Sequence, residues 1–235
     1  MATVLAIFSL AGLLYFFSQY LQLVRGCSTL QAGLTELPAS LSSIAVVAVV
    51  AAAVHRLGNG RALGGGLILA AAGLLVVAVG ESHGGIVVIC IGLLVIGAGV
   101  GLAFTVSTGA VLGSVPADRA GAASAISETG LELGVALGIA VLGTIQDVGY
   151  RLLLGRPPAG LPDRVVDAAE QSLATLSGVI DQADPGQAQL LGHAQTAFTH
   201  AMQATAVIAA GILLVAGVMA ARRVPATSET SEETA

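Results

Sequence analysis

The feature that most constrains this chain is a succession of apolar runs, each long enough to cross a lipid bilayer. A membrane-spanning helix needs about 20 predominantly apolar residues. The 235-residue sequence is 55% hydrophobic and 10% charged, contains no lysine, and offers six such runs. We therefore predict an all-α, polytopic membrane protein. Its predicted spans are residues 3–24, 34–54, 62–79, 85–112, 120–145 and 201–221, with short turns such as residues 81–84 between them.

A long polar segment, residues 146–200, separates the fifth and sixth runs and is too charged to cross a bilayer. Small and apolar residues recur in it at helical spacing, which predicts an amphipathic helix on the surface of the bundle. These residues are Val165, Ala169, Ser172, Leu176 and Ile180. Residues 222–235 are polar and are expected to form a disordered tail.

Six spans place both termini on the same side of the membrane. Arginines on the short loops and helix ends are more numerous on that side, which favours the cytoplasm for both termini. The segment 146–200 is then expected outside the cell. We predict a multi-pass protein of the plasma membrane.

The fifth run contains two carboxylates, Glu128 and Glu132, although a charge at the centre of a membrane helix costs about 2.5 to 3.5 kcal/mol. Four residues apart, they share one face of the helix, and Gly130, Gly134 and Gly138 repeat on a roughly opposite face. Glycines let another helix pack closely. A carboxylate in a low dielectric can bind a proton near neutral pH and release it, as proton-for-substrate exchange requires. The alternative is that one or both acids only hydrogen-bond a neighbouring helix.

Three further features carry weaker predictions. Glu36, in the opening turns of the second span, is a weak candidate for proton coupling or substrate passage, with an interfacial carboxylate as the alternative. Gly97 and Gly101 of the fourth span are expected to serve helix packing. The turn after the second span is short and basic and contains Arg56, Gly58 and Arg61. We expect it on the cytoplasmic side.

Several classes of function have no support in the sequence. No metalloprotease or serine-hydrolase motif is present, so we expect no catalytic residues, no cofactor and no enzymatic activity. Cys27 and Cys90 lack the spacing of metal ligands and are expected to be free thiols. There is no basic patch for a nucleic acid.

Two stretches resemble the EmrB/QacA subfamily of 14-span drug:proton antiporters in the major facilitator superfamily. The first is FSQYLQLVRGCSTLQAGLTELP, residues 17–38, and the second is VPADRAGAASAISETGLELGVALGIAVLGTI, residues 115–145. The resemblance covers nearly the whole chain but only the last six helices of that subfamily. It implies six transmembrane helices forming one half of a major facilitator fold, in which substrate lies between two halves built of inverted three-helix repeats.

The resemblance also implies proton-driven export of lipophilic, often cationic compounds. Glu128 and Glu132 stand where some members have acids in the penultimate helix, whereas Glu36 occupies a position that is often apolar. The subfamily's first eight helices have no counterpart here, so we expect a fragment or a half-transporter. The expected partners are the lipid bilayer, protons, a small lipophilic or cationic substrate, and the missing N-terminal half or a second copy. An alternative is a structural or regulatory membrane subunit that binds a partner through its glycine faces and transports nothing.

Overall fold

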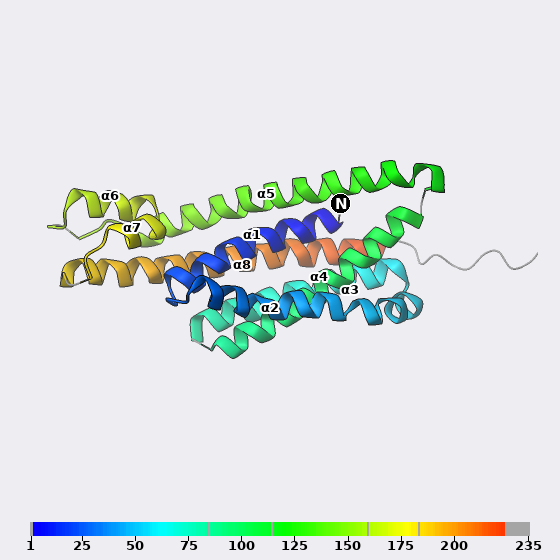
Figure 1. Ribbon diagram of the computed structural model, residues 1–235, viewed down its shortest axis with the longest axis horizontal. Helices are drawn as coiled ribbons and strands as arrows, with labels where there is room; N and C mark the ends of the chain where they lie inside the picture. Colours follow the sequence, from blue (N-terminus) through cyan, green and yellow to red (C-terminus); the bar gives the residue numbers. More distant parts are fainter. Residues whose placement is uncertain (1, 84, 114, 159, 183, 224–235) are drawn as a thin grey trace, which may run out of the picture.

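The computed structural model describes residues 2–83, 85–113, 115–158, 160–182 and 184–223 as an elongated bundle of long helices (Figure 1). The helices are α1 (Ala2–Leu23), α2 (Thr29–Ala45), α3 (Val47–His83), α4 (Ile86–Gly113), α5 (Ala120–Leu154), α6 (Asp163–Gln171), α7 (Leu173–Val179) and α8 (Pro185–Arg223), with a 3-10 turn, η1 (Ala117–Arg119). The expectation of an all-helical protein is confirmed for these residues. The expected disordered tail lies outside the described residues from position 224 onward.

Within the described ranges, four helices are long and apolar enough to cross a membrane by length and composition. They are Val47–Glu81, Ile86–Gly113, Ala120–Leu154 and Pro185–Arg222. The first helix contributes a shorter apolar stretch, Ile7–Leu23. The described residues thus contain several apolar helices of spanning length, as expected, although these are fewer than the six runs counted in the sequence.

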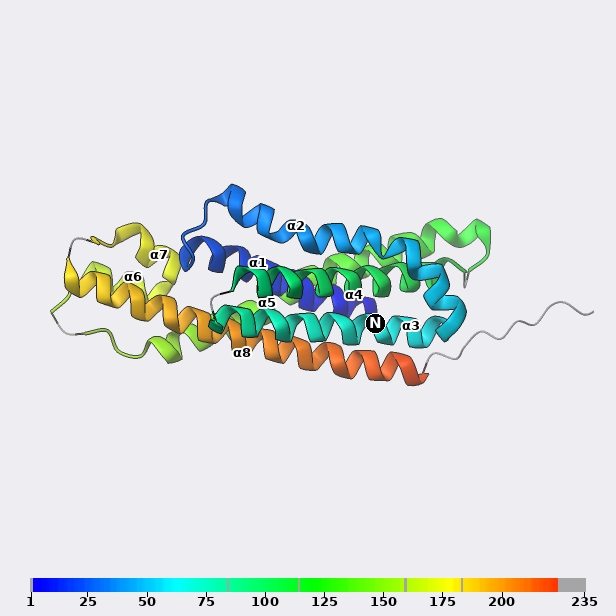
Figure 2. The ribbon, with the colours of Figure 1, turned by 90° about the horizontal axis from the view of Figure 1, so that it is seen from below.

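The expected second span, 34–54, is divided between α2 and the first turns of α3. Helix α2 begins early, at Thr29, because Ser28 and Gln31 form a capping box in which each side chain accepts the other's backbone N–H. Within Val47–His83, Gly58 is not helical (φ 78°, ψ 161°), a conformation that glycine adopts without steric cost. The chain reverses its direction between α2 and the main part of α3 (Figure 2).

Helices α5 and α8 extend far into the segment expected as a loop. Buried residues recur every four positions along α5, and this stripe continues past the expected end at Ile145. Its members are Gly134, Gly138, Leu142, Gln146, Tyr150 and Leu154. The Gln146 amide donates to the carbonyl of Phe198 (3.2 Å) and accepts from the hydroxyl of Thr205 (3.3 Å), so the two helices are joined there.

The expected surface helix within residues 146–200 is two short helices, α6 and α7. Ser172 separates them with an extended backbone (φ −171°, ψ 159°) and caps α7 by accepting the N–H of Thr175 (3.1 Å). The Tyr150 hydroxyl donates to the carbonyl of Ala169 (2.9 Å) and holds α6 against α5. Both short helices lie at the end of the bundle opposite the N-terminus, beside the extended parts of α5 and α8 (Figure 1).

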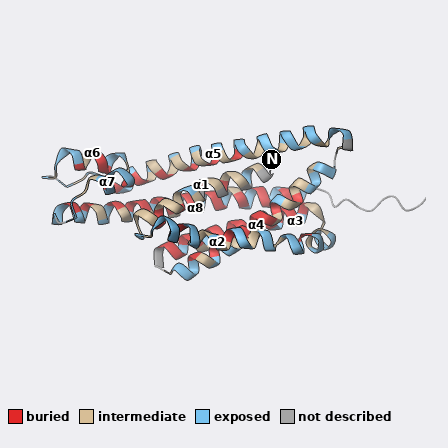
Figure 3. Ribbon diagram, viewed as in Figure 1, coloured by how far each residue is buried: buried red, intermediate tan, exposed pale blue. Residues whose placement is uncertain are grey.

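The core runs between helices that are not all neighbours in sequence. Helix α3 packs on α4 and α8, α1 on α5 and α8, and α2 on α4. Figure 3 shows the buried residues on the facing sides of α3, α4 and α8.

Candidate functional site

The two faces predicted for the fifth span are separated in α5. Glu128 and Glu132 are exposed, whereas Gly134 and Gly138 are buried against α1. A Cβ on Gly134 would lie 2.9 Å from the carbonyl oxygen of Val4, and one on Gly138 would overlap the carbonyl of Phe8. The carboxylates are therefore directed away from α1.

At Gly130 the contact with α1 is looser. An added Cβ would lie 3.5 Å from a methyl group of Val4, which is ordinary van der Waals contact. The close approach between α1 and α5 is thus concentrated at the next two glycines of the series. The part of α5 that carries Glu128 is held less tightly than the part that follows Glu132.

Helix α5 is the least enclosed of the candidate spans. Only 17% of its most apolar stretch is buried in the bundle, against 61% for Val47–Glu81 and 50% for Ile86–Gly113. Large apolar side chains near the glutamates are also exposed: Ile126, Leu133 and Leu137. Carboxylates in membrane spans almost always face a bundle interior or a water-filled cavity. This face of α5 therefore needs a polar cavity or a further protein segment beside it.

Glu36 lies apart from the α5 carboxylates. Figure 1 shows α2 and α5 on opposite sides of the bundle. The Glu36 side chain is half-buried, and its Oε1 atom has no hydrogen-bond partner among the described residues. The structure thus brings Glu128 and Glu132 together on one helix face and places the third predicted acid elsewhere.

The glycines of α4 make a second close contact. A Cβ on Gly97 would overlap the carbonyl of Ala39, and one on Gly101 would lie 2.7 Å from the carbonyl oxygen of Ser43. Helix α4 therefore approaches α2 as closely as α5 approaches α1. In both contacts the glycines are four residues apart.

The basic turn lies around Gly58, within α3, between the first turns of that helix and its main part. Arg56 and Arg61 are exposed on either side of Gly58. Figure 2 shows this turn toward the same end of the bundle as the last residues of α8.

Glu81, which is expected in the turn of residues 81–84, is buried instead. Helix α3 continues to His83, and Glu81 is 5% exposed. Neither carboxylate oxygen has a hydrogen-bond partner in the part of the chain that the structure describes. Leu74, Val77 and Ala78 are buried before it, so the helical spacing of apolar residues could have indicated that this face extends to Glu81.

Tyr20 and Arg25 stand beside Glu81. The Tyr20 hydroxyl donates to the backbone carbonyl of Glu81 (3.5 Å), and Arg25 Nε donates to the Tyr20 hydroxyl oxygen (3.1 Å). The Arg25 guanidinium also lies 5.8 Å from the centre of the Tyr20 ring, within the range of a cation–π contact. These residues connect the end of α1 to the end of α3.

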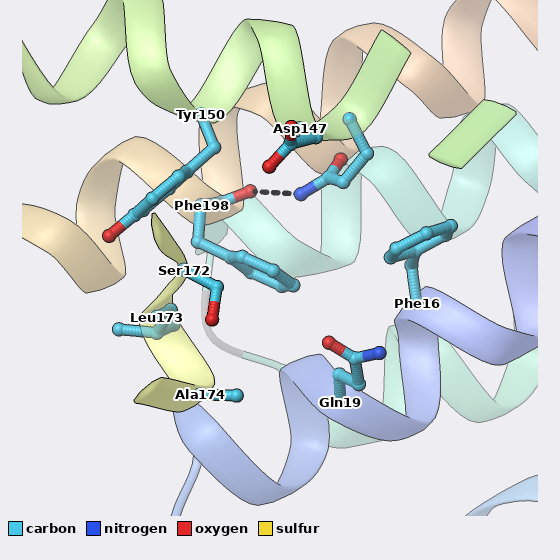
Figure 4. A pocket seen from close by; sticks show the side chains of 9 residues that line it. Phe16, Gln19, Asp147, Tyr150, Ser172, Leu173, Ala174 and Phe198 are labelled. Carbon is cyan, nitrogen blue, oxygen red and sulfur yellow. Dashed lines mark hydrogen bonds between the residues drawn. The ribbon is translucent and has the colours of Figure 1, made fainter. Parts of the chain in front are cut away.

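A small pocket lies between α1, α5, α7 and α8 (Figure 4). Its volume is ≈ 80 Å³, below the several hundred Å³ that enclose a drug-sized ligand. It is lined by Phe16, Gln19, Gln146, Asp147, Tyr150, Ser172, Leu173, Ala174 and Phe198. Asp147 is paired with Arg151 (3.1 Å), and both side chains are about half exposed. This pocket therefore has no room for a drug-sized substrate.

Metal-binding geometry is not found in the described residues. No group of three or more His, Cys, Asp or Glu side chains among them could hold a metal ion. Cys27 and Cys90 are free thiols in the structure.

Three curated relatives are bacterial resistance or efflux proteins. The chain is 40% identical to the multidrug efflux pump LfrA of Mycolicibacterium smegmatis over 218 residues, which are 92% of this chain and 43% of LfrA. It is 29% identical to the methyl viologen resistance protein SmvA of Salmonella typhimurium over 194 residues, or 82% of this chain and 39% of SmvA. It is 35% identical to the multidrug resistance protein Stp of Mycobacterium tuberculosis over 138 residues, or 59% of this chain and 26% of Stp.

The chain thus spans at most about two fifths of the length of these relatives. No protein-family model matches it. Its homologues are transporters, and together with the apolar helices they indicate a multi-pass membrane protein.

Proposed function

We propose that this chain is the C-terminal half of a proton-coupled multidrug efflux antiporter of the EmrB/QacA type in the major facilitator superfamily. In this proposal its six long helical segments form one wall of a substrate cavity. An N-terminal half, or a second copy of the chain, forms the other wall. The similarity to LfrA over 92% of this chain supports the assignment to drug efflux.

The pairing of helices supports the proposed fold. A half of a major facilitator transporter is built from two inverted three-helix repeats. If α1, α2 and α3 form one repeat and α4, α5 and α8 the other, the α1–α5 and α2–α4 contacts are equivalent. The glycine contacts support the same equivalence, because each pair of helices approaches closely at glycines four residues apart.

The single observation that carries the functional proposal is the exposure of Glu128 and Glu132 on a helix of membrane-spanning length. Their helix is anchored to α1 by the opposite face, which leaves both carboxylates directed out of the six-helix unit. Leaving them charged in hydrocarbon would cost about 2.5 to 3.5 kcal/mol each. We infer that they face the substrate cavity, where each exchanges a proton as substrate binds and leaves.

The chemistry of the pair suggests the class of substrate. Two carboxylates one helical turn apart attract a cation when they are ionised and release it when they are protonated. The exposed Leu133 and Leu137 on the same part of α5 would contact an apolar body. We therefore propose lipophilic or cationic compounds as substrates, in accord with the names of the relatives.

We further propose that both termini and the basic turn at Arg56 and Arg61 are cytoplasmic, so that α6 and α7 lie outside the cell. The arginine distribution supports this orientation. Everted membrane vesicles would then take up substrate into their lumen.

The test is drug uptake by everted vesicles from cells that express the gene product containing this chain. We expect a fluorescent lipophilic cation to accumulate only while a pH gradient is maintained, and a protonophore to abolish accumulation. Glu128→Gln and Glu132→Gln should each stop gradient-driven uptake while leaving the amount of protein in the membrane unchanged.

The matched control is Glu170→Gln, the same substitution at an exposed position of α6. It should transport like the wild type. Undiminished uptake by both Glu128→Gln and Glu132→Gln would contradict the assigned role of these two glutamates. Absence of gradient-dependent uptake by the wild type, with stable co-purification of another membrane protein, would instead support a non-transporting subunit.

A further inference from the structure

Glu81 is a buried acid to which the proposed function assigns no role. It lies at the end of the apolar stretch of α3 and is 5% exposed. Both of its carboxylate oxygens lack a hydrogen-bond partner among the described residues. A buried carboxylate without a partner is costly, and such a group is neutralised by a proton or by a nearby cation. The side chains around Glu81 indicate whether a proton or a cation neutralises it in the structure.

The one cation whose charge acts on Glu81 among the described residues is Arg25. Its Nε atom donates to the Tyr20 hydroxyl (3.1 Å) instead of to the carboxylate. The Tyr20 hydroxyl in turn approaches the backbone carbonyl of Glu81 (3.5 Å), not its side chain. Arg25 is therefore bound to Tyr20, next to Glu81, and makes no ion pair with the carboxylate in the structure.

The backbone around this group is packed in the bundle, whereas the Arg25 side chain is exposed and contacts only Tyr20 in the interactions described above. Tyr20 is 1% exposed, and its ring stacks on Phe17 with the ring centres 6.2 Å apart. The Gln195 amide of α8 donates to the carbonyl of Leu23 (2.9 Å) and fixes the end of α1. Arg25 itself is exposed in the connection that follows. A change in the charge of Glu81 can therefore be met by Arg25 without moving α1.

We propose that Glu81 binds and releases a proton, and that Arg25 is the counter-charge that replaces the proton. In the protonated state the acid is neutral and Arg25 stays on Tyr20, as in the structure. On release, the O–H bond of the acid breaks and the proton passes to water at this end of the bundle. The guanidinium of Arg25 then leaves the Tyr20 hydroxyl and pairs with the carboxylate, which ties the α1–α2 connection to the end of α3.

Among the residues whose side chains the structure describes, few other titratable groups lie near this site. The Tyr20 hydroxyl and the Cys27 thiol belong to α1 and to the connection after it, and both are close enough for their charges to interact. Helix α4 carries Cys90 as its one titratable residue. On α8, His200 is exposed and hydrogen-bonded to Gln203 (3.2 Å). None of these supplies a fixed positive charge like that of Arg25.

The role of Glu81 in transport rests on the proposed function, but its proton binding does not. The first test is infrared difference spectroscopy of the full gene product in lipid nanodiscs, titrated with pH. We expect a carboxylic-acid band near neutral pH that is lost in Glu81→Gln and kept in Glu170→Gln. In Arg25→Gln the band should persist to a pH higher by about one unit or more, because a cation close to a carboxylate favours its charged form by that amount.

An unchanged acid band in Glu81→Gln, or identical titrations of Arg25→Gln and the wild type, would overturn the proposal. Arg156→Gln, at an exposed position between α5 and α6, is the matched control for the loss of an arginine.

The second measurement is vesicle uptake by Glu81→Gln, which should respond less to an imposed pH gradient than wild-type uptake does. An unaltered response would remove Glu81 from the transport cycle. If the wild type itself shows no gradient-driven uptake, the proposed function fails, while the infrared titration still decides whether Glu81 binds a proton.

Discussion

The carbonyl oxygen of Phe8 in α1 occupies the place where a side chain on Gly138 of α5 would begin. This contact fixes which side of α5 faces the bundle, and it therefore also fixes where the glutamates of α5 point. The position of Glu128 and Glu132 thus depends on a backbone contact at the far side of their helix. Substitution of the contact glycines should therefore change the packing of α5 on α1 while leaving the carboxylates of Glu128 and Glu132 in the chain.

Gly138→Ala should destabilise the protein, because the added methyl group can be accommodated only if α1 and α5 move apart. Overpacking of this kind costs about 1 to 3 kcal/mol. Thermal unfolding of the detergent-solubilised protein measures the loss. Gly121→Ala on the same helix is the control, since nothing lies within 4 Å of a Cβ there. Equal melting temperatures for the two variants would show that the close contact does not contribute to stability.

Gln146→Leu should weaken the joint between α5 and α8. The substitution removes the hydrogen bonds to the Phe198 carbonyl and the Thr205 hydroxyl. Interhelical hydrogen bonds in membrane proteins contribute about 0.6 to 1.7 kcal/mol, and we expect a loss in that range on unfolding in a denaturing detergent. Gln189→Leu, at an exposed position of α8, should cost less. A greater loss from the exposed substitution would contradict the assigned role of Gln146.

Asp184 should make the start of α8 sensitive to acid. Its carboxylate accepts the backbone N–H groups of Gln187 (3.2 Å) and Gly186 (2.8 Å), and these bonds lower its pKa from the ordinary 3.8. Because the folded pKa is below the unfolded one, the stabilisation is present above about pH 3.8 and is lost as the pH falls through the folded value. Hydrogen exchange in residues 186–190, normalised to intrinsic rates, should therefore increase at acid pH.

The control for this cap is a pair of variants. Asp184→Asn keeps an acceptor oxygen without a titratable proton, so its protection should not depend on pH in this range. Asp184→Ala should exchange faster at every pH. Acid-dependent exchange in the asparagine variant that matches the wild type would exclude Asp184 as the titrating group.

Much of the bundle could be predicted because membrane spans are recognised by local composition. The apolar runs at 85–112 and 120–145 correspond closely to α4 and to the first part of α5. The separation of Glu132 from Gly134 and Gly138 follows from helical spacing alone. These predictions needed no knowledge of which helix packs on which.

The features that were missed depend on partners distant in sequence. Gln146 and Tyr150 are polar and are expected in a loop, but they lie on the buried stripe of α5 and donate hydrogen bonds to the carbonyls of Phe198 and Ala169. Glu81 is expected in a turn, but α3 continues through it, and the Tyr20 hydroxyl of α1 donates to its backbone carbonyl. Local composition could not indicate which distant segments supply these contacts, although buried positions recur every four residues along α5 and apolar ones recur at helical spacing before Glu81.

The most direct test of the proposed function is proton counterflow in proteoliposomes that contain the full gene product and a luminal pH dye. A lipophilic cation added outside should enter the lumen in exchange for protons, so the lumen should become more alkaline. In the double variant Glu128→Gln, Glu132→Gln, neither change should occur. Cation entry without a change in luminal pH, or proton movement by the double variant at the wild-type rate, would contradict the account.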